Sequence, residues 1–197
     1  MKSKILIALS ALVLLFSSCK NESTTPKDDA INANDSITKI PVAINHSFTI
    51  DSEIKNLPVT DSTNFDNYKS THVLKPFEID SLQLKTILKD GSDYSLNYSL
   101  KLSDNFKTLV ITYQKGEMEL FTALINYDNN YKYINHLGIA YDETAESSSR
   151  IESLIEKNQI IVKETNYGED DSKITKERYI IKSNGDIQKA NKDHLVK

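Results

Sequence analysis

The stretch that decides the fold class is Tyr94-Ser95-Leu96-Asn97-Tyr98-Ser99-Leu100-Lys101-Leu102. Apolar residues occupy every second position and polar residues fill the gaps, which is the period of a β-strand with one buried and one solvated face. Asp104 and Asn105 then supply a turn. Leu109, Ile111 and Tyr113 continue the alternation beyond it. The pattern therefore predicts two consecutive amphipathic strands joined by a short connection.

The chain downstream repeats this alternation of strand and turn. Residues 118–127 are apolar at neighbouring positions, which predicts a central strand with something packed on each face. Further strands are predicted at 131–141, 150–156, 159–165 and 174–182, and Asn184-Gly185 is a two-residue hairpin signal. Turns recur every 8–15 residues or so, as in an antiparallel meander. We therefore expect a mainly β protein, either an antiparallel meander sheet or a partly closed barrel, with one or two short helices.

Three regions have less regular patterns. Residues 81–89 predict a helix capped by Asp80 and ended by Gly91, although Leu82 and Leu84 also fit a strand. Residues 147–157 have apolar spacing that suits either a strand or a helix. Residues 47–50 are predicted as a strand, 57–58 and 61–67 as loops, and 72–79 as an edge strand because Pro76 cannot donate to a ladder.

Composition excludes several classes of protein. A length of 197 residues fits one domain, and 39% hydrophobic with 26% charged residues is typical of a globular chain. Acidic residues outnumber basic ones, 28 to 24, which argues against a nucleic-acid binder that uses a basic face. The single cysteine excludes an internal disulfide and a cysteine-rich zinc module.

The N-terminus has the three parts of a secretory signal peptide. Lys2 and Lys4 form a basic start, residues 5–16 are apolar apart from Ser10, and small serines follow at 17 and 18. The apolar run is too short to span a bilayer, which needs about 20 residues. The alternative is a short N-terminal anchor helix.

The ending Leu15-Phe16-Ser17-Ser18-Cys19 resembles a bacterial lipobox, in the looser form common in small Bacteroidota-type lipoproteins of unknown function. Ser17 and Ser18 match the small residues of that motif, whereas Phe16 departs from its usual Leu, Val or Ile. The resemblance implies that residues 1–18 are removed and that Cys19 receives a diacylglycerol on its thiol. It also implies fatty acylation of the new amine, with palmitate as a typical chain.

Lipid on Cys19 would suffice as a membrane anchor. Each buried CH₂ contributes about 0.8 kcal/mol, so two or three acyl chains make detachment slow. Cleavage would also remove Lys2 and Lys4 and leave a more acidic protein, which gains little from anionic headgroups. We expect a cell-envelope protein, anchored to the outer membrane, with its periplasmic or surface display undecided.

Residues 19–36 are predicted to be the lipidated cysteine and a tether, and residues 37–197 one β-rich domain. The tether is almost entirely polar and cannot bury enough apolar surface to offset the entropy of ordering. Its start, Lys20-Asn21-Glu22, partly resembles the surface-export signal of some Bacteroidota lipoproteins, but Asn21 interrupts the acidic pair. A plain linker is an equally good interpretation.

Motifs for chemistry are missing from the sequence. The histidines His46, His72, His136 and His194 lie too far apart for HxH or HExxH spacing. The acidic stretches 142–146 and 169–171 lack the DxDxDG pattern and are predicted as solvated hairpin tips, and the serines at 147–149 lack GxSxG framing. We therefore predict no catalytic residue, no metal site and no cofactor, and interpret His136 as a surface or interface histidine.

Tyrosine is the one unusual abundance, with ten tyrosines and no tryptophan. Four of them, Tyr127, Tyr131, Tyr133 and Tyr141, flank one predicted hairpin. Tyrosine is favoured both at binding surfaces and in ordinary strands, and we favour the strand or core interpretation. The lack of tryptophan argues mildly against a sugar-stacking platform.

The sequence leaves three functional hypotheses. The first is a non-enzymatic binding or structural lipoprotein that meets a protein or glycan partner through the exposed face of its sheet; nucleic acid is not an expected partner. The second is an envelope hydrolase with an unrecognised site. The third is an inhibitor or immunity lipoprotein, whose acidic charge would help it capture a basic enzyme.

Overall fold

A computed structural model describes residues 48–144, 149–168 and 171–190 of the protein. All of these belong to one compact unit, Asn45–Lys197. The expected signal peptide, the expected tether with Cys19, His46 and His194 lie outside the described residues. Within the described ranges, no helix is long and apolar enough to cross a membrane.

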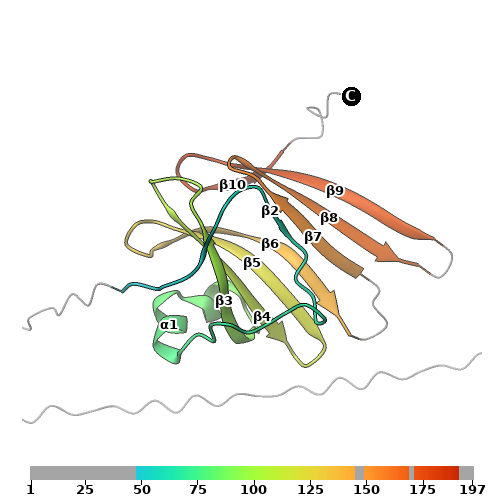
Figure 1. Ribbon diagram of the computed structural model, residues 1–197, viewed down its shortest axis with the longest axis horizontal. Helices are drawn as coiled ribbons and strands as arrows, with labels where there is room; N and C mark the ends of the chain where they lie inside the picture. The colour runs from blue at the N-terminus through green and yellow to red at the C-terminus, as the bar shows by residue number, and fades with distance from the viewer. Residues whose placement is uncertain (1–47, 145–148, 169–170, 191–197) are drawn as a thin grey trace, which may run out of the picture. The chain divides into compact units, whose positions relative to one another are not determined.

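The described part of the chain is mainly β, and its strands form one 10-stranded sheet (Figure 1). The sheet order is β1-β3-β4-β5-β6-β7-β8-β9-β10, with β2 paired to β7, so β3 to β10 form an open antiparallel meander. This confirms the predicted fold class in its open form. The elements are β1 Ile54–Lys55, β2 Val59–Asp61, α1 Pro76–Ser81, α2 Leu84–Ile87, β3 Ser92–Leu100, β4 Lys107–Lys115, β5 Glu119–Tyr127, β6 Tyr133–Glu143, β7 Ser149–Ile155, β8 Gln159–Tyr167, β9 Ser172–Ile181 and β10 Ile187–Lys189.

The sheet changes direction between β6 and β7. These strands share a single residue pair, Tyr141 with Ile151, whereas β4 and β5 pair along their whole length. Figure 1 shows β7, β8 and β9 set at an angle to β4, β5 and β6. The two halves share one core, whose buried members include Val110, Leu124 and Ile139 from the first half and Ile155, Ile160 and Ile181 from the second.

The opposite face of the first half is covered by the helices. Leu82, Leu84 and Leu88 pack with apolar residues of β3, β4 and β5 in a second core. The Tyr127 hydroxyl donates a hydrogen bond to the Leu82 carbonyl at 2.9 Å and ties this segment to β5. β4 and β5 are therefore buried on both faces, which confirms the prediction of a central strand over residues 118–127.

A β-bulge interrupts the alternation that defines β3. Leu96 pairs with Ile111, but the next pair is Tyr98 with Val110, so Asn97 is an extra residue. As a result Leu96 lies in the helix-side core and Tyr98 in the core between the two halves. The prediction that these alternate residues share one buried face was wrong, because a bulge shifts the side-chain period by one residue.

The helices differ from the sequence prediction. Pro76 begins α1 rather than marking an edge strand, because its fixed φ and missing N–H suit the first turn of a helix. Glu78 supports this start by accepting a hydrogen bond from the Lys75 N–H at 2.7 Å. The helix predicted over 81–89 is split: Ser81 is the last residue of α1, and α2 covers only Leu84–Ile87, because Gln83 at its N-cap adopts φ +56°.

Two further predictions upstream of α1 were wrong. Phe48–Ile50 forms no strand. Instead, the Phe48 ring packs edge-on against the Tyr131 ring, with 4.8 Å between the two ring centres. Asp61, predicted in a loop, ends strand β2, which pairs with the edge of β7 left free by β6. Such long-range pairing carries no signal in a three-residue stretch. The strands predicted at 131–141, 150–156, 159–165 and 174–182 are confirmed as β6 to β9.

Candidate functional site

The candidate site is a polar groove along the outer edge of β3, here called the β3 groove. It combines a cavity of about 330 Å³ with an adjoining cavity of about 570 Å³. Glu53, Thr71 and Asn97 line both cavities. The walls come from segments 51–55, 60–63 and 67–72 and from β3 itself, so the groove exists only in the folded chain.

The bulge in β3 lies beside the groove, since Asn97 lines both cavities. Upstream of it, the Leu96 N–H donates to the His72 carbonyl at 2.9 Å; downstream, the Ser99 N–H donates to the Glu53 carbonyl at 2.8 Å. The strand edge is thus covered on both sides of Asn97. Bulges commonly redirect side chains next to functional sites, and this one directs Asn97 and Tyr98 to the same face of the sheet.

A buried carboxylate forms the base of the groove. Asp61 is only 4% exposed and accepts hydrogen bonds from the Tyr98 hydroxyl at 2.7 Å and from the Thr63 N–H at 3.0 Å. Burial, followed by the charge of Asp61 and this hydrogen bond, raises the pKa of Tyr98 far above its usual value. The phenol therefore remains a hydrogen-bond donor to Asp61 at every physiological pH.

Charged side chains of both signs line the smaller cavity. The Lys55 ammonium lies 4.1 Å from the centre of the Tyr98 ring, a cation–π contact. Lys69 is the second cation, and Glu53 and Asp61 are the anions. The formal charges of this lining therefore balance.

Asn97 connects the groove to a buried polar row. Its Nδ2 donates to Thr112 Oγ1 at 2.6 Å, and Thr112 Oγ1 lies 2.7 Å from Thr122 Oγ1. The Oδ1 of Asn97 is buried and accepts no hydrogen bond from the residues that the structure describes. A buried acceptor without a donor is unusual in folded proteins and calls for a physical explanation.

The loop after β2 is a well-defined wall. Asn64 and Asn67 each donate a backbone N–H to the other's side-chain oxygen, at 3.0 and 2.9 Å. The Phe65 N–H donates to Asp142 Oδ2 at 2.9 Å, which fixes the loop to β6. Asp142 was predicted at a solvated hairpin tip, but it belongs to β6 because that strand extends to Glu143.

The sequence-predicted histidines are not brought together. His72 lines the larger cavity, and its Nε2 is 3.7 Å from the Glu78 carboxylate. His136, on β6, shares a 2.8 Å hydrogen bond between its Nδ1 and the Tyr133 hydroxyl, and partial burial lowers its pKa. Among the described residues, no three His, Cys, Asp or Glu side chains gather as a metal site.

The four tyrosines of the predicted hairpin lie in different environments. Tyr127 is fully buried, which confirms the core interpretation for this residue. Tyr131 lies under the Lys107 ammonium, 3.7 Å from the ring centre, and the Tyr141 hydroxyl donates to Glu143 at 2.7 Å. None of the four lines the β3 groove.

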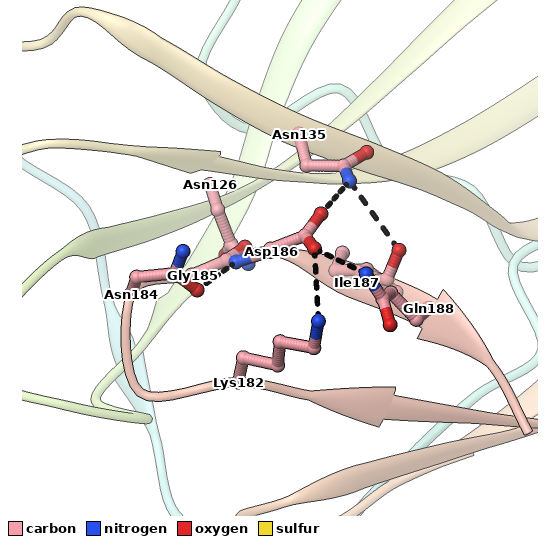
Figure 2. A network of polar contacts seen from close by, with 8 residues as sticks. All are labelled: Asn126, Asn135, Lys182, Asn184, Gly185, Asp186, Ile187 and Gln188. Carbon is pink, nitrogen blue, oxygen red and sulfur yellow. Dashed lines mark hydrogen bonds and ion pairs between the residues drawn. The ribbon is translucent and has the colours of Figure 1, made fainter.

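A second polar cluster surrounds the β9–β10 turn and is satisfied internally (Figure 2). Buried Asn126 donates to the Gly185 carbonyl at 2.7 Å, and Asn135 donates to Asp186 at 2.7 Å. The Asn135 hydrogen bond is the main cause that lowers the pKa of Asp186, with Lys182 3.6 Å away. Because these groups satisfy one another and join β9–β10 to β5 and β6, the cluster holds the two sheet halves together.

The chain matches no protein-family model, no curated protein and no solved structure. Sequence reasoning missed the groove, because Asp61, Lys69 and Asn97 belong to segments without a motif. In the structure, Val59 and Asp61 are buried and Thr60 between them is exposed, but a carboxylate at a buried strand position cannot be recognised from the three letters alone.

Proposed function

We propose that this chain is a lipid-anchored protein of the bacterial cell envelope that binds a ligand in the β3 groove without transforming it. The observation that carries the binding role is the Asp61–Tyr98 pair at the base of the groove. Burying a carboxylate is costly unless hydrogen bonds compensate it. Binding sites place a few such polar groups in a concavity of a few hundred Å³ or more.

Binding, rather than catalysis, agrees with how the groove's polar groups are engaged. Both Asp61 oxygens accept hydrogen bonds from the chain, and the raised pKa of Tyr98 keeps its phenol from acting as a base. The His72 imidazole faces the Glu78 carboxylate. These groups are fixed by one another, which suits recognition of a ligand's shape and hydrogen-bonding pattern.

The anchor rests on the N-terminal sequence, with Cys19 as the lipidated residue. Replacing Cys19 with Ser should abolish incorporation of an alkyne-tagged palmitate and move the protein from the membrane to the soluble fraction, or leave it as an uncleaved precursor. The control is the same labelling of the unaltered chain. Equal labelling and membrane retention in both would contradict lipidation.

Binding in the groove is tested by photo-cross-linking in intact envelopes. A photoreactive amino acid at Thr60, an exposed residue of the groove wall, should form an adduct with the bound ligand, whereas the same group at exposed Thr86 in α2 should not. Equal adducts at both positions, or none at Thr60, would argue against the groove. Turnover of an envelope substrate that is lost in His72→Ala would favour the hydrolase alternative instead.

A further inference from the structure

We propose that the ligand of the β3 groove is a neutral oligosaccharide. This inference rests on the proposed function and assigns a chemical class to its ligand. Four features of the groove support it: its extent, its mixture of acidic and basic side chains, its hydrogen-bonding groups and one tyrosine ring.

The extent of the groove favours a chain-like ligand. Its two cavities adjoin through a shared wall and measure about 330 and 570 Å³, volumes typical of sites for organic ligands. A single ion or small anion would contact only a fraction of the lining. A ligand of several linked rings would contact both cavities.

The charges disfavour ionic ligands. A phosphate or carboxylate is normally recognised by a surplus of cationic donors, but here Lys55 and Lys69 are balanced by Glu53 and Asp61. The adjoining cavity adds a further acid, Asp51, which would repel an anion. A cationic ligand would meet Lys55 and Lys69, which line the smaller cavity.

The hydrogen-bonding groups suit hydroxyls. A hydroxyl has one donor hydrogen and two acceptor lone pairs, so it can satisfy acids, amides and ammonium groups alike. The groove offers the exposed Glu53 carboxylate as an acceptor and exposed ammonium groups at Lys55 and Lys69 as donors. Ser62, Thr63 and Thr71 add side-chain hydroxyls to the lining.

Tyr68 supplies an aromatic surface. It is half-buried in the wall of the smaller cavity, close in sequence to Lys69. A phenol combines an apolar face, which can cover the C–H face of a pyranose, with a polar tip that stays hydrated. One tyrosine among many hydrogen-bonding groups is compatible with a chain that lacks tryptophan, because hydrogen bonds supply most of the recognition.

Three tetrasaccharides of different charge test this inference. The full-length chain, purified in detergent, would be titrated calorimetrically with neutral tetra-N-acetylchitotetraose, its deacetylated cationic counterpart and anionic tetragalacturonate. Neutral maltotetraose and cellotetraose extend the panel. We expect at least one neutral tetramer to bind at least tenfold more tightly than either charged one. Tighter binding of a charged tetramer, or no neutral binding, would overturn the inference.

Matched variants assign the binding to the groove. Tyr68→Ala should weaken binding of the neutral tetramer at least tenfold, whereas Tyr167→Ala, at an exposed tyrosine on β8, should not. Thr60→Val and Thr86→Val form a second pair, in which a methyl group replaces the side-chain hydroxyl. Equal affinities within both pairs would place the sugar elsewhere and overturn the inference. A cross-link at Thr60 without any neutral binding would refute the sugar but retain the proposed function; loss of both would refute both.

Discussion

At the scale of single residues, the Tyr98 hydroxyl is the side-chain donor to the buried carboxylate of Asp61. Tyr98→Phe removes that donor and leaves Asp61 Oδ2 without the 2.7 Å bond. An unsatisfied buried acceptor costs about 1–3 kcal/mol. We therefore expect the free energy of unfolding in urea to fall by about that amount.

Tyr113→Phe is the matched control for this residue. Tyr113 is also buried, 7% exposed, and lies in the helix-side core against the Tyr94 and Phe121 rings. Burial raises the pKa of Tyr113 to about 12, so it too is a neutral phenol at physiological pH. If both variants lost the same stability, the effect would belong to removal of any buried hydroxyl and not to the Asp61 pair.

At the scale of elements, the β9–β10 turn depends on a glycine. Gly185 has φ +87°, and a Cβ there would lie 3.0 Å from the Phe106 ring and 3.1 Å from the Ile134 side chain. Gly185→Ala should therefore lower the free energy of unfolding by about 1–2 kcal/mol from backbone strain, plus the cost of displacing these neighbours. Urea denaturation measures the loss.

Alanine variants of two glycines elsewhere in the chain distinguish the two causes of the expected loss at Gly185, backbone strain and steric crowding. Gly116 also has positive φ, +65°, but its Cβ would meet no atom within 4 Å; Gly138 has the same free space and no positive φ. We expect Gly138→Ala to be nearly neutral and Gly116→Ala to fall between it and Gly185→Ala. Equal losses at positions 116 and 185 would show that packing against Phe106 and Ile134 contributes nothing.

The elements also show what sequence reasoning can reach. The strands from β6 to β9 and the Asn184-Gly185 turn were predicted because their signals are local: period-two alternation and a glycine that tolerates positive φ. β2 was not, because it pairs with β7, far along the chain. The Asn97 bulge was not, because the alternation of apolar residues runs through it unbroken and only the register against β4 reveals the extra residue. The groove depends on those two features, so its residues could not be predicted either.

At the scale of the whole folded unit, the two sheet halves should unfold together. The strands at their junction, β6 and β7, share one residue pair, so backbone hydrogen bonds alone would connect the halves only weakly. The core between them instead mixes buried side chains of both, with Val110 and Leu124 from one half and Ile155 and Ile160 from the other. Side-chain packing in this shared core should therefore couple the unfolding of one half to that of the other.

Ile155→Ala tests this coupling. Ile155 is fully buried in β7, so the cavity should cost about 2–5 kcal/mol. Hydrogen exchange of the β4 amides, in the other half, should accelerate by the same factor as that of the β8 amides, because one cooperative transition exposes both. Exposed Ile174→Ala, on β9, is the control and should change neither rate. Acceleration confined to β8 would mean that the two halves open independently. In that case the groove would be lost before the first half unfolds, because its walls join β2 to β3.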